Sequence, residues 1–377
     1  MRMHPHRFLP CWKIFEKRLA PFMNLSTRSG LKTFLAGAAL AALLLLPASS
    51  VWAKPSYWVY AYTNNHNDTN GHPMALSTDI PWNNITHLVD AFAIPTSGGG
   101  VNLATGLYGS QAVSVAHANG TRAILSVGGE GQGSYFASNV STYQSTFISN
   151  IVKAVTQTGS AQGGYDGVDI DWEFPSSTDK PNFMSFMANL YVAIKALPVS
   201  PVDGQSRTLT FFVSPGYYVC GVDWANINKY CDAAVISGYA FFIDGYNGPL
   251  RDPSTGNYSD CGGVSTGPDI NGVFTKLTAK GFPATQFVLG CPFFGLYNGG
   301  SEVGIEKLLK SGIAGAYQTA QAEQIYTYNG YSTTANTAQS FCDKINWALS
   351  KGMKGSACGR SRRRRRLRTS PWSLFGT

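Results

Sequence analysis

The chain has 377 residues, of which 44% are hydrophobic and 13% are charged, and it contains 41 glycines. This composition excludes a disordered chain and a coiled coil, and it provides enough apolar surface for a large core. The net charge of +8 lies at the two ends, since residues 1–53 hold seven basic residues against one acid and residues 360–377 hold seven arginines. The body between them is mildly acidic, so the charge does not argue for a nucleic-acid partner.

Residues 1–53 form an N-terminal extension with a predicted secretion signal. Arg28 and Lys32 precede an apolar run of 13 residues at 34–46, which is shorter than the roughly 20 residues that span a bilayer. An uncleaved membrane anchor is the alternative. We expect a secreted protein, extracellular or periplasmic, with no stable membrane association after signal cleavage. Met23 is an alternative start.

From residue 57 onward, short apolar runs alternate with amphipathic stretches. Each run is rich in Val, Ile, Leu, Phe or Tyr, as strands buried on both faces are. The runs lie at 57–62, 85–94, 121–127, 165–172, 208–213, 233–239 and 286–293. The clearest helical pattern, 183–197, repeats apolar residues at spacings of three and four. This alternation predicts a parallel α/β sheet, either doubly wound or closed into a barrel.

The eighth strand–helix unit departs from this pattern. Residues 338–350 predict a helix, and 351–355 should lead into a last strand. The chain continues with Ser356-Ala-Cys-Gly and then an arginine run that includes 362–366. Because burying unpaired charges is costly, we expect the tail 360–377 to stay outside the barrel. The expected result is a defective or divergent eighth unit, with the first and seventh strands poorly bridged. A disordered tail or a reading-frame shift would account for it.

The most informative segment is Asp166-Gly-Val-Asp-Ile-Asp-Trp-Glu173. Side chains alternate between the two faces of a strand, so Asp169, Asp171 and Glu173 share one face. The apolar residues of the segment occupy the opposite face, toward the covering helices: Val168, Ile170 and Trp172. The acids rise toward the carboxyl end of the strand, where the active sites of barrels lie.

Crowded carboxyl groups raise at least one pKa, which is what a general acid at neutral pH requires. Glu173, the last in the row, is the predicted proton donor, with Asp171 close enough to couple to it and Asp169 deeper. The alternative is a set of acids that accept backbone hydrogen bonds or bind Ca²⁺. His66, Asp68 and His72 are alternative metal ligands, but their surroundings favour a solvated turn, and we expect no metal and no cofactor.

These residues resemble glycoside hydrolase family 18, the chitinase family, over about residues 57–355. The string D-G-V-D-I-D-W-E matches the family's signature, and Ser126-Val-Gly-Gly129 resembles its second motif. Ser237-Gly-Tyr-Ala240 resembles the family's Met-x-Tyr-Asp, with Ser237 and Ala240 as departures. The resemblance implies a single-domain (β/α)8 TIM barrel over residues 54–359.

The resemblance further implies hydrolysis of β-1,4-linked N-acetylglucosamine polymers with retention, in which the substrate's acetamido group is the nucleophile. Glu173 would be the acid, Asp171 would orient the acetamido group with Asp169 behind it, and Tyr239 would bind its carbonyl. Asp166 would support the motif. Residues expected to bind or support the substrate are Tyr62, Phe92, Trp172, Ser126, Gly128 and Gly129.

Two alternatives remain open for the function. An endo-β-N-acetylglucosaminidase acting on glycoprotein glycans needs the same N-acetyl group. A weakly active or inactive chitin-binding, lectin-like barrel is the other, although such members usually lose the terminal Glu that this chain retains as Glu173. The expected partner is chitin or another N-acetylglucosamine-containing oligosaccharide, bound by a monomer, with no nucleic acid. Of six cysteines after residue 53, Cys291 is predicted to be a buried free thiol.

Overall fold

The computed structural model describes residues 54–63, 75–103, 106–213, 219–241, 246–251, 258–259, 265–266, 269–297, 301–310 and 314–359. The predicted secretion signal, the arginine tail and the turn with His66, Asp68 and His72 lie outside these ranges. Within them, no helix combines the length and the apolar character that a membrane crossing requires.

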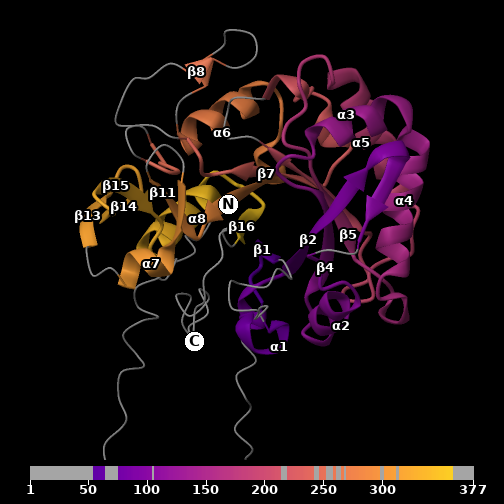
Figure 1. The fold of residues 1–377 in the computed structure, drawn as a ribbon, viewed down its shortest axis with the longest axis horizontal. Coiled ribbons are helices and arrows are strands. Elements are labelled where there is room, and N and C mark those ends of the chain that lie inside the picture. The colour runs from indigo at the N-terminus through magenta and orange to yellow at the C-terminus, as the bar shows by residue number, and fades with distance from the viewer. Residues whose placement is uncertain are drawn as a thin grey trace, which may run out of the picture. The chain divides into compact units, whose positions relative to one another are not determined.

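Eight parallel strands form a closed barrel, with helices on its outside (Figure 1). Around the barrel the order is β1, β16, β10, β7, β6, β5, β4 and β2, and β2 pairs with β1 to complete the ring. The prediction of a (β/α)8 barrel is therefore confirmed, and each of the seven predicted runs overlaps a barrel strand, to within two residues at its carboxyl end. The strands are β1 (Trp58–Thr63), β2 (His87–Thr96), β4 (Arg122–Gly128), β5 (Gly167–Asp171), β6 (Thr208–Val213), β7 (Ala233–Ser237), β10 (Phe287–Pro292) and β16 (Gly355–Gly359).

Helices alternate with the barrel strands, except that among the described residues only two short 3-10 helices, Val219–Gly221 and Ile227–Lys229, lie between β6 and β7. The described helices are α1 (Leu76–Asp79), α2 (Ser110–Ala118), α3 (Gly133–Thr142), α4 (Gln144–Gln157), α5 (Lys180–Lys195), α6 (Ile270–Ala279), α7 (Ile305–Lys310) and α8 (Ala338–Ser350). Two of them fulfil specific predictions: α5 covers most of the pattern predicted at 183–197, and α8 has the predicted bounds. Thr337 caps α8, because its hydroxyl accepts a hydrogen bond from the backbone of Ser340.

An antiparallel insertion, which the pattern of apolar runs does not predict, lies between β10 and α8. Its strands form two small sheets next to α7 (Figure 1). One pairs β11 (Phe294–Tyr297) with β12 (Ser301–Gly304), and the other joins β13 (Ala314–Gln318), β14 (Glu323–Tyr328) and β15 (Tyr331–Ala335). Smaller antiparallel pieces are β3 (Gly100–Asn102), which pairs with β2, and the β8 (Tyr258–Ser259) and β9 (Ser265–Thr266) pair.

The eighth strand corrects one expectation. β16 pairs in parallel with β1 on one side and with β10 on the other over all five of its residues, so the first and seventh strands are properly bridged. Ladder hydrogen bonds come from the backbone, so a strand of Gly, Ser, Ala and Cys closes the barrel without large side chains. The strand is nevertheless divergent, because its small residues let it lie very close to its neighbour. A Cβ at Gly355 would be 1.9 Å from the carbonyl oxygen of Trp58.

The apolar core has two layers. The barrel interior contains a small cluster that includes Tyr60, Val89, Ile124, Val235 and Ala357. A much larger cluster fills the space between the barrel and the helices. Cys291 belongs to this outer layer and is buried and free, as predicted, whereas Cys220 is held in a disulfide.

Candidate active site

Strand β5 presents its acids to the barrel interior. Asp169 is fully buried and Asp171 nearly so, while the alternate residues Val168 and Ile170 pack in the layer under the helices. Glu173 follows two positions after the end of the strand and is half-buried. The acids thus rise from the barrel interior toward the carboxyl end of the strands, as strand alternation predicts.

Asp169 is held by three hydroxyl groups from three different strands. Tyr62 and Ser126 donate to Oδ2 at 3.0 and 2.9 Å, and Thr210 donates to Oδ1 at 2.7 Å. Burial raises the pKa of Asp169, and the hydrogen bonds from Thr210, Ser126 and Tyr62 partly offset that rise. The carboxyl group is therefore fixed in place, although burial disfavours its charge.

Two glycines fix the backbone of Asp171. Gly128 has a φ of +123°, and a Cβ there would lie 2.1 Å from the carbonyl oxygen of Asp171. The next residue, Gly129, has a φ of +96° and donates its N–H to that same oxygen at 2.9 Å. Only glycine combines this close approach with this backbone conformation. Gly128 and Gly129 thus allow β4 to lie close to β5, the strand that carries the acids. Gly128 is buried and has no side chain that could contact a ligand.

Tyr239 follows two positions after the end of β7 and interacts electrostatically with Asp171 and Glu173. Burial raises the pKa of the Tyr239 hydroxyl far above its usual range, and the negative charges of Asp171 and Glu173 raise it further. The hydroxyl therefore lies within electrostatic reach of both carboxyl groups and stays a neutral hydrogen-bond donor. Its ring packs edge-on against Phe294 at 5.5 Å and near Phe212 at 6.3 Å.

Of the other residues expected to bind substrate, Tyr62 and Phe92 are partly exposed, whereas Ser126 is buried. Tyr62 is half-buried and uses its hydroxyl on Asp169, and Phe92 is half-buried in β2, where the register with β4 shifts. Ser126 is fully buried, and its hydroxyl donates to Asp169, so the structure gives it a supporting place and no surface for a ligand.

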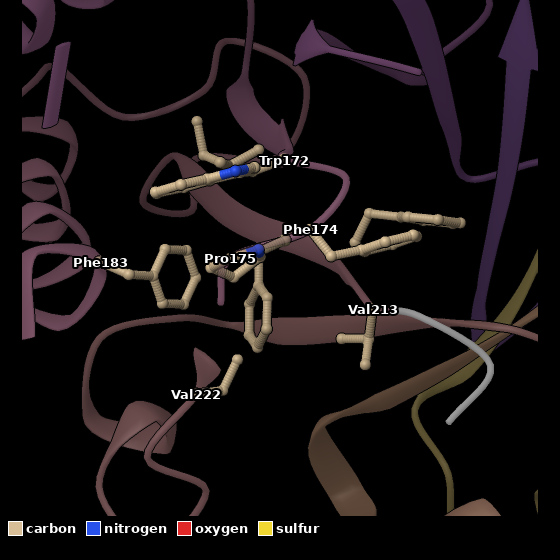
Figure 2. A pocket seen from close by; sticks show the side chains of 9 residues that line it. Trp172, Phe174, Pro175, Phe183, Val213 and Val222 are labelled. Carbon is tan, nitrogen blue, oxygen red and sulfur yellow. The ribbon is translucent and has the colours of Figure 1, made fainter. Parts of the chain in front are cut away.

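Trp172 lies in the packing layer, away from the acids. It is 2% exposed, its ring stacks on Phe136 at 5.3 Å, and Phe183 meets it edge-on. Figure 2 shows it among the side chains that line a small apolar cavity. The volume of this cavity is about 10 Å³, at most the size of one water molecule. This burial leaves no face for a sugar, which corrects the expectation of substrate contact at Trp172. The cavity is lined by Ile170, Trp172, Phe174, Pro175, Phe183, Phe211, Phe212, Val213 and Val222.

Asp166 has a structural place before the start of β5. It is fully buried and accepts hydrogen bonds from the backbone N–H of Ala123 at 2.7 Å and from the hydroxyl of Ser200 at 2.7 Å. His117 Nε2 lies 2.8 Å from the same carboxyl group. Asp166 thus joins the start of β5 to β4, to helix α2 through His117 and to the loop that holds Ser200, on the opposite face from Asp169.

Sequence reasoning missed Thr210 and Phe294. Thr210 is the register partner of Asp169 on the neighbouring strand β6. The polar residues in the run Thr208-Leu-Thr-Phe-Phe-Val213 were the available signal, because they alternate with apolar ones. Phe294 begins the insertion, whose position next to Tyr239 no local pattern reveals.

Ser237 and Ala240, the two residues that depart from the family's motif around Tyr239, carry no carboxyl group. The Ser237 hydroxyl donates to the carbonyl oxygen of Tyr239 at 3.2 Å. Ala240 has a φ of +62°, and its N–H donates to Oδ1 of Asn247 at 3.0 Å. Across the described ranges, no three His, Cys, Asp or Glu side chains gather as metal ligands would.

Comparisons with known proteins agree with this geometry. A family model described as glycosyl hydrolases family 18 matches residues 57–358. A chitinase-like effector of Moniliophthora roreri is 29% identical over 235 residues, which cover 57% of this chain and 54% of that protein. Chitinase A1 of Niallia circulans is 29% identical over 152 residues, covering 35% of this chain and 21% of that protein. The chain thus spans about half the length of the first relative and about a fifth of the second.

A solved structure shows the same fold. The chitinase-like agglutinin of Robinia pseudoacacia superposes with a TM-score of 0.67 at 19% identity, covering 84% of this chain and 96% of that one.

Proposed function

Because the chain belongs to glycosyl hydrolase family 18, we propose that it hydrolyses β-1,4-linked N-acetylglucosamine polymers, chitin and chito-oligosaccharides, with retention of the anomeric configuration. The observation that supports this most is the place of Asp171, Glu173 and Tyr239 at the carboxyl ends of β5 and β7, where the two acids raise the pKa of the Tyr239 hydroxyl. Secretion of the protein, which we also propose, fits a polymeric substrate outside the cell.

Glu173 is the proposed proton donor. It is half-buried and follows the strand that carries Asp169 and Asp171, at the carboxyl end where barrel active sites lie. In the first step it gives its proton to the glycosidic oxygen as the bond from that oxygen to the anomeric carbon breaks. In the second step it takes a proton from the attacking water, which restores the acid.

The substrate's own acetamido group is the proposed nucleophile. Its carbonyl oxygen forms a bond to the anomeric carbon and gives an oxazolinium ion, which water then opens. The carboxylate of Asp171 accepts the acetamido N–H and stabilises the positive charge. The Tyr239 hydroxyl, whose raised pKa keeps it neutral, donates a hydrogen bond to the acetamido oxygen. This bond orients the oxygen for attack.

A hydrolysis assay tests the proposal. The purified protein is incubated with chitin oligomers, with a high-mannose glycan, and with deacetylated and cellulose oligomers of matched length as controls. We expect cleavage of the chitin oligomers alone, with the β-anomer appearing first in the NMR spectrum. An initial α-anomer, or equal cleavage of the deacetylated oligomer, would contradict the mechanism. Preferential cleavage of the glycan would assign the same chemistry to glycoprotein substrates.

A non-hydrolytic carbohydrate-binding barrel is the second candidate. The observation that favours it is the replacement of an acid by Ala240 beside Tyr239. Matched relatives include proteins described as a chitinase-like effector and a chitinase-like agglutinin. Under this function the protein binds chitin oligomers in calorimetry, and no product accumulates over days.

A further inference from the structure

Asn247 lies in the segment after β7 and connects two elements that surround Tyr239. The residue is 1% exposed. Its side-chain oxygen accepts the backbone N–H of Ala240 at 3.0 Å, and its side-chain nitrogen donates to the backbone oxygen of Phe294 at 2.8 Å. Its own carbonyl oxygen accepts the N–H of Phe241 at 3.0 Å. One amide side chain therefore bridges the end of β7 to the start of the insertion.

Both ends of this bridge touch Tyr239. Ala240 is the next residue in the chain, and the Phe294 ring packs edge-on against the Tyr239 ring at 5.5 Å. The neighbouring glycine shows how close the two segments are. A Cβ at Gly248 would lie 1.9 Å from the carbonyl oxygen of Gly238 and 3.2 Å from Cα of Tyr239. The Asn247–Gly248 segment thus lies directly against the backbone that carries the Tyr239 ring.

The backbone that Asn247 holds is one that alanine rarely adopts. Ala240 has a φ of +62°, in the left-handed region where a Cβ crowds the following carbonyl oxygen. A hydrogen bond to its N–H offsets part of that strain and holds the turn in a single conformation. Without it, the turn can relax toward ordinary φ values, and the Tyr239 hydroxyl would move away from Asp171 and Glu173.

Asn247 is itself fixed by a buried ion pair. Its backbone N–H donates to Oε2 of Glu323 at 3.2 Å and to Oγ1 of Thr334 at 2.8 Å. Oε1 of Glu323 lies 3.1 Å from the Lys344 ammonium group, and both side chains are fully buried. Lys344 also donates to the backbone oxygen of Gly248 at 2.6 Å. The amide is therefore attached to a charged, hydrogen-bonded centre in the insertion and α8 and has little freedom to move.

We propose that Asn247 is a positioning residue for the reaction, acting through Tyr239 by fixing the Tyr239–Ala240 backbone and the Phe294 ring. The proposal rests on the proposed function, in which Tyr239 orients the acetamido group. In this proposal the insertion, through Phe294 and its hydrogen bond with Asn247, helps to hold the Tyr239 hydroxyl at the carboxyl end of the barrel.

The test compares Asn247→Ala with a matched control, Asn336→Ala. Asn336 is equally buried and belongs to the same polar network. Its Nδ2 donates to the Pro292 oxygen at 3.1 Å and its Oδ1 accepts from Lys344 at 2.6 Å, but neither contact reaches Tyr239. We expect both variants to lower the melting temperature. Only Asn247→Ala should lower kcat, by about tenfold or more with little change in KM, as misplacement of a catalytic group does.

Two further variants separate positioning from general stability. Asn247→Asp keeps the acceptor for Ala240 and should recover part of the lost kcat. In a Tyr239→Phe background, Asn247→Ala should lower kcat by less than about twofold further, because the group it positions is gone. Equal kcat losses in the Asn247→Ala and Asn336→Ala variants, or an undiminished effect of Asn247→Ala in the Tyr239→Phe background, would overturn the proposal.

A spectroscopic measurement keeps the result independent of activity. With 3-fluorotyrosine placed at position 239, the ¹⁹F resonance should shift or broaden in Asn247→Ala and stay unchanged in Asn336→Ala. If the wild-type protein hydrolyses none of the substrates, the proposed function fails, and this spectrum still decides whether Asn247 positions Tyr239. An unchanged ¹⁹F spectrum in Asn247→Ala would refute the positioning role.

Discussion

Gly128 lies so close to the carbonyl oxygen of Asp171 that a Cβ at Gly128 would be 2.1 Å from it. The contact joins β4 to β5 at the residue proposed to stabilise the oxazolinium ion. No side chain can be added there unless the two strands move apart. The Ser-Val-Gly-Gly motif therefore has a steric explanation.

Replacing Gly128 by alanine should unfold or distort the site. The added carbon meets backbone, which cannot rotate away, and the φ of +123° is itself unfavourable for alanine. We expect a loss of about 3 kcal/mol or more in the free energy of unfolding, with hydrolysis abolished. Gly131→Ala is the control, because Gly131 also has positive φ but has nothing within 4 Å. It should cost about 1 kcal/mol. Equal losses in the two variants would refute the steric explanation.

Replacing Glu173 by glutamine should remove the proton donor and keep the shape of the site. Hydrolysis should fall at least about a hundredfold, while the melting temperature and the affinity for chitin oligomers stay near the wild-type values. The measurements are initial rates and calorimetric titration. Near-normal turnover would show that the acid has been misassigned.

Replacing Thr210 by valine should destabilise the protein by an amount that depends on pH, because Thr210 donates a hydrogen bond to the Asp169 carboxyl group. Burial raises the pKa of Asp169, and the Thr210 hydroxyl opposes that rise. Without the hydroxyl, the pKa of Asp169 in the folded protein rises further above its value in the unfolded chain. The folded protein then binds the Asp169 proton more tightly than the unfolded chain does, so the free energy of unfolding falls as the pH rises above the unfolded-state pKa of Asp169. The valine variant should therefore be more destabilised at pH 7 than at pH 4, by roughly 1–2 kcal/mol at pH 7.

Thermal unfolding of the wild type and the variant at both pH values measures this effect. Ser237→Ala is the control, since the Ser237 hydroxyl donates to a neutral carbonyl. Its cost should be the same at the two pH values. A pH-independent cost for Thr210→Val would mean that Asp169 does not change its charge between pH 4 and pH 7.

Truncating the chain before or after β16 should show whether this strand is needed to close the barrel. A chain that ends after Gly359 keeps every paired residue of β16, whereas a chain that ends after Lys354 leaves β1 and β10 without a common partner. We expect the first chain to melt cooperatively and the second to be insoluble or to melt without a sharp transition. Circular dichroism on heating measures both. Cooperative melting of the shorter chain would show that β16 is dispensable.

The sequence was sufficient for features that depend on local periodicity. Alternation along β5 separated Asp169 and Asp171 from Val168 and Ile170, and apolar spacing located α5 and α8. The error at β16 arose from expecting large apolar side chains, although backbone pairing does not require them. Strand parity correctly placed Trp172 under the helices, and only its inclusion among the expected substrate-binding residues disagrees with its burial.

Features that depend on distant segments were not available from the sequence. The bonds of Thr210 and Tyr62 to Asp169 require the strand register, which the pattern of apolar runs does not fix to the residue. The contact of Phe294 with Tyr239 and the bridge through Asn247 require the antiparallel insertion. Its strands are short, and two buried charged residues, Glu323 in the insertion and Lys344 in α8, resemble surface residues in the sequence.

The closure of the ring by β16 also sets an order of events during synthesis. Cys358 donates its thiol to the backbone oxygen of Tyr60, 298 positions earlier in the chain. At a synthesis rate of about 5–20 residues per second, roughly 15–60 seconds separate the two residues as they are made. During that interval β1 presents an exposed edge, and β10 does so once residues 287–292 have been made, which invites pairing with other nascent chains. Cellular yield should therefore depend on chaperones that shield these edges until the last strand arrives.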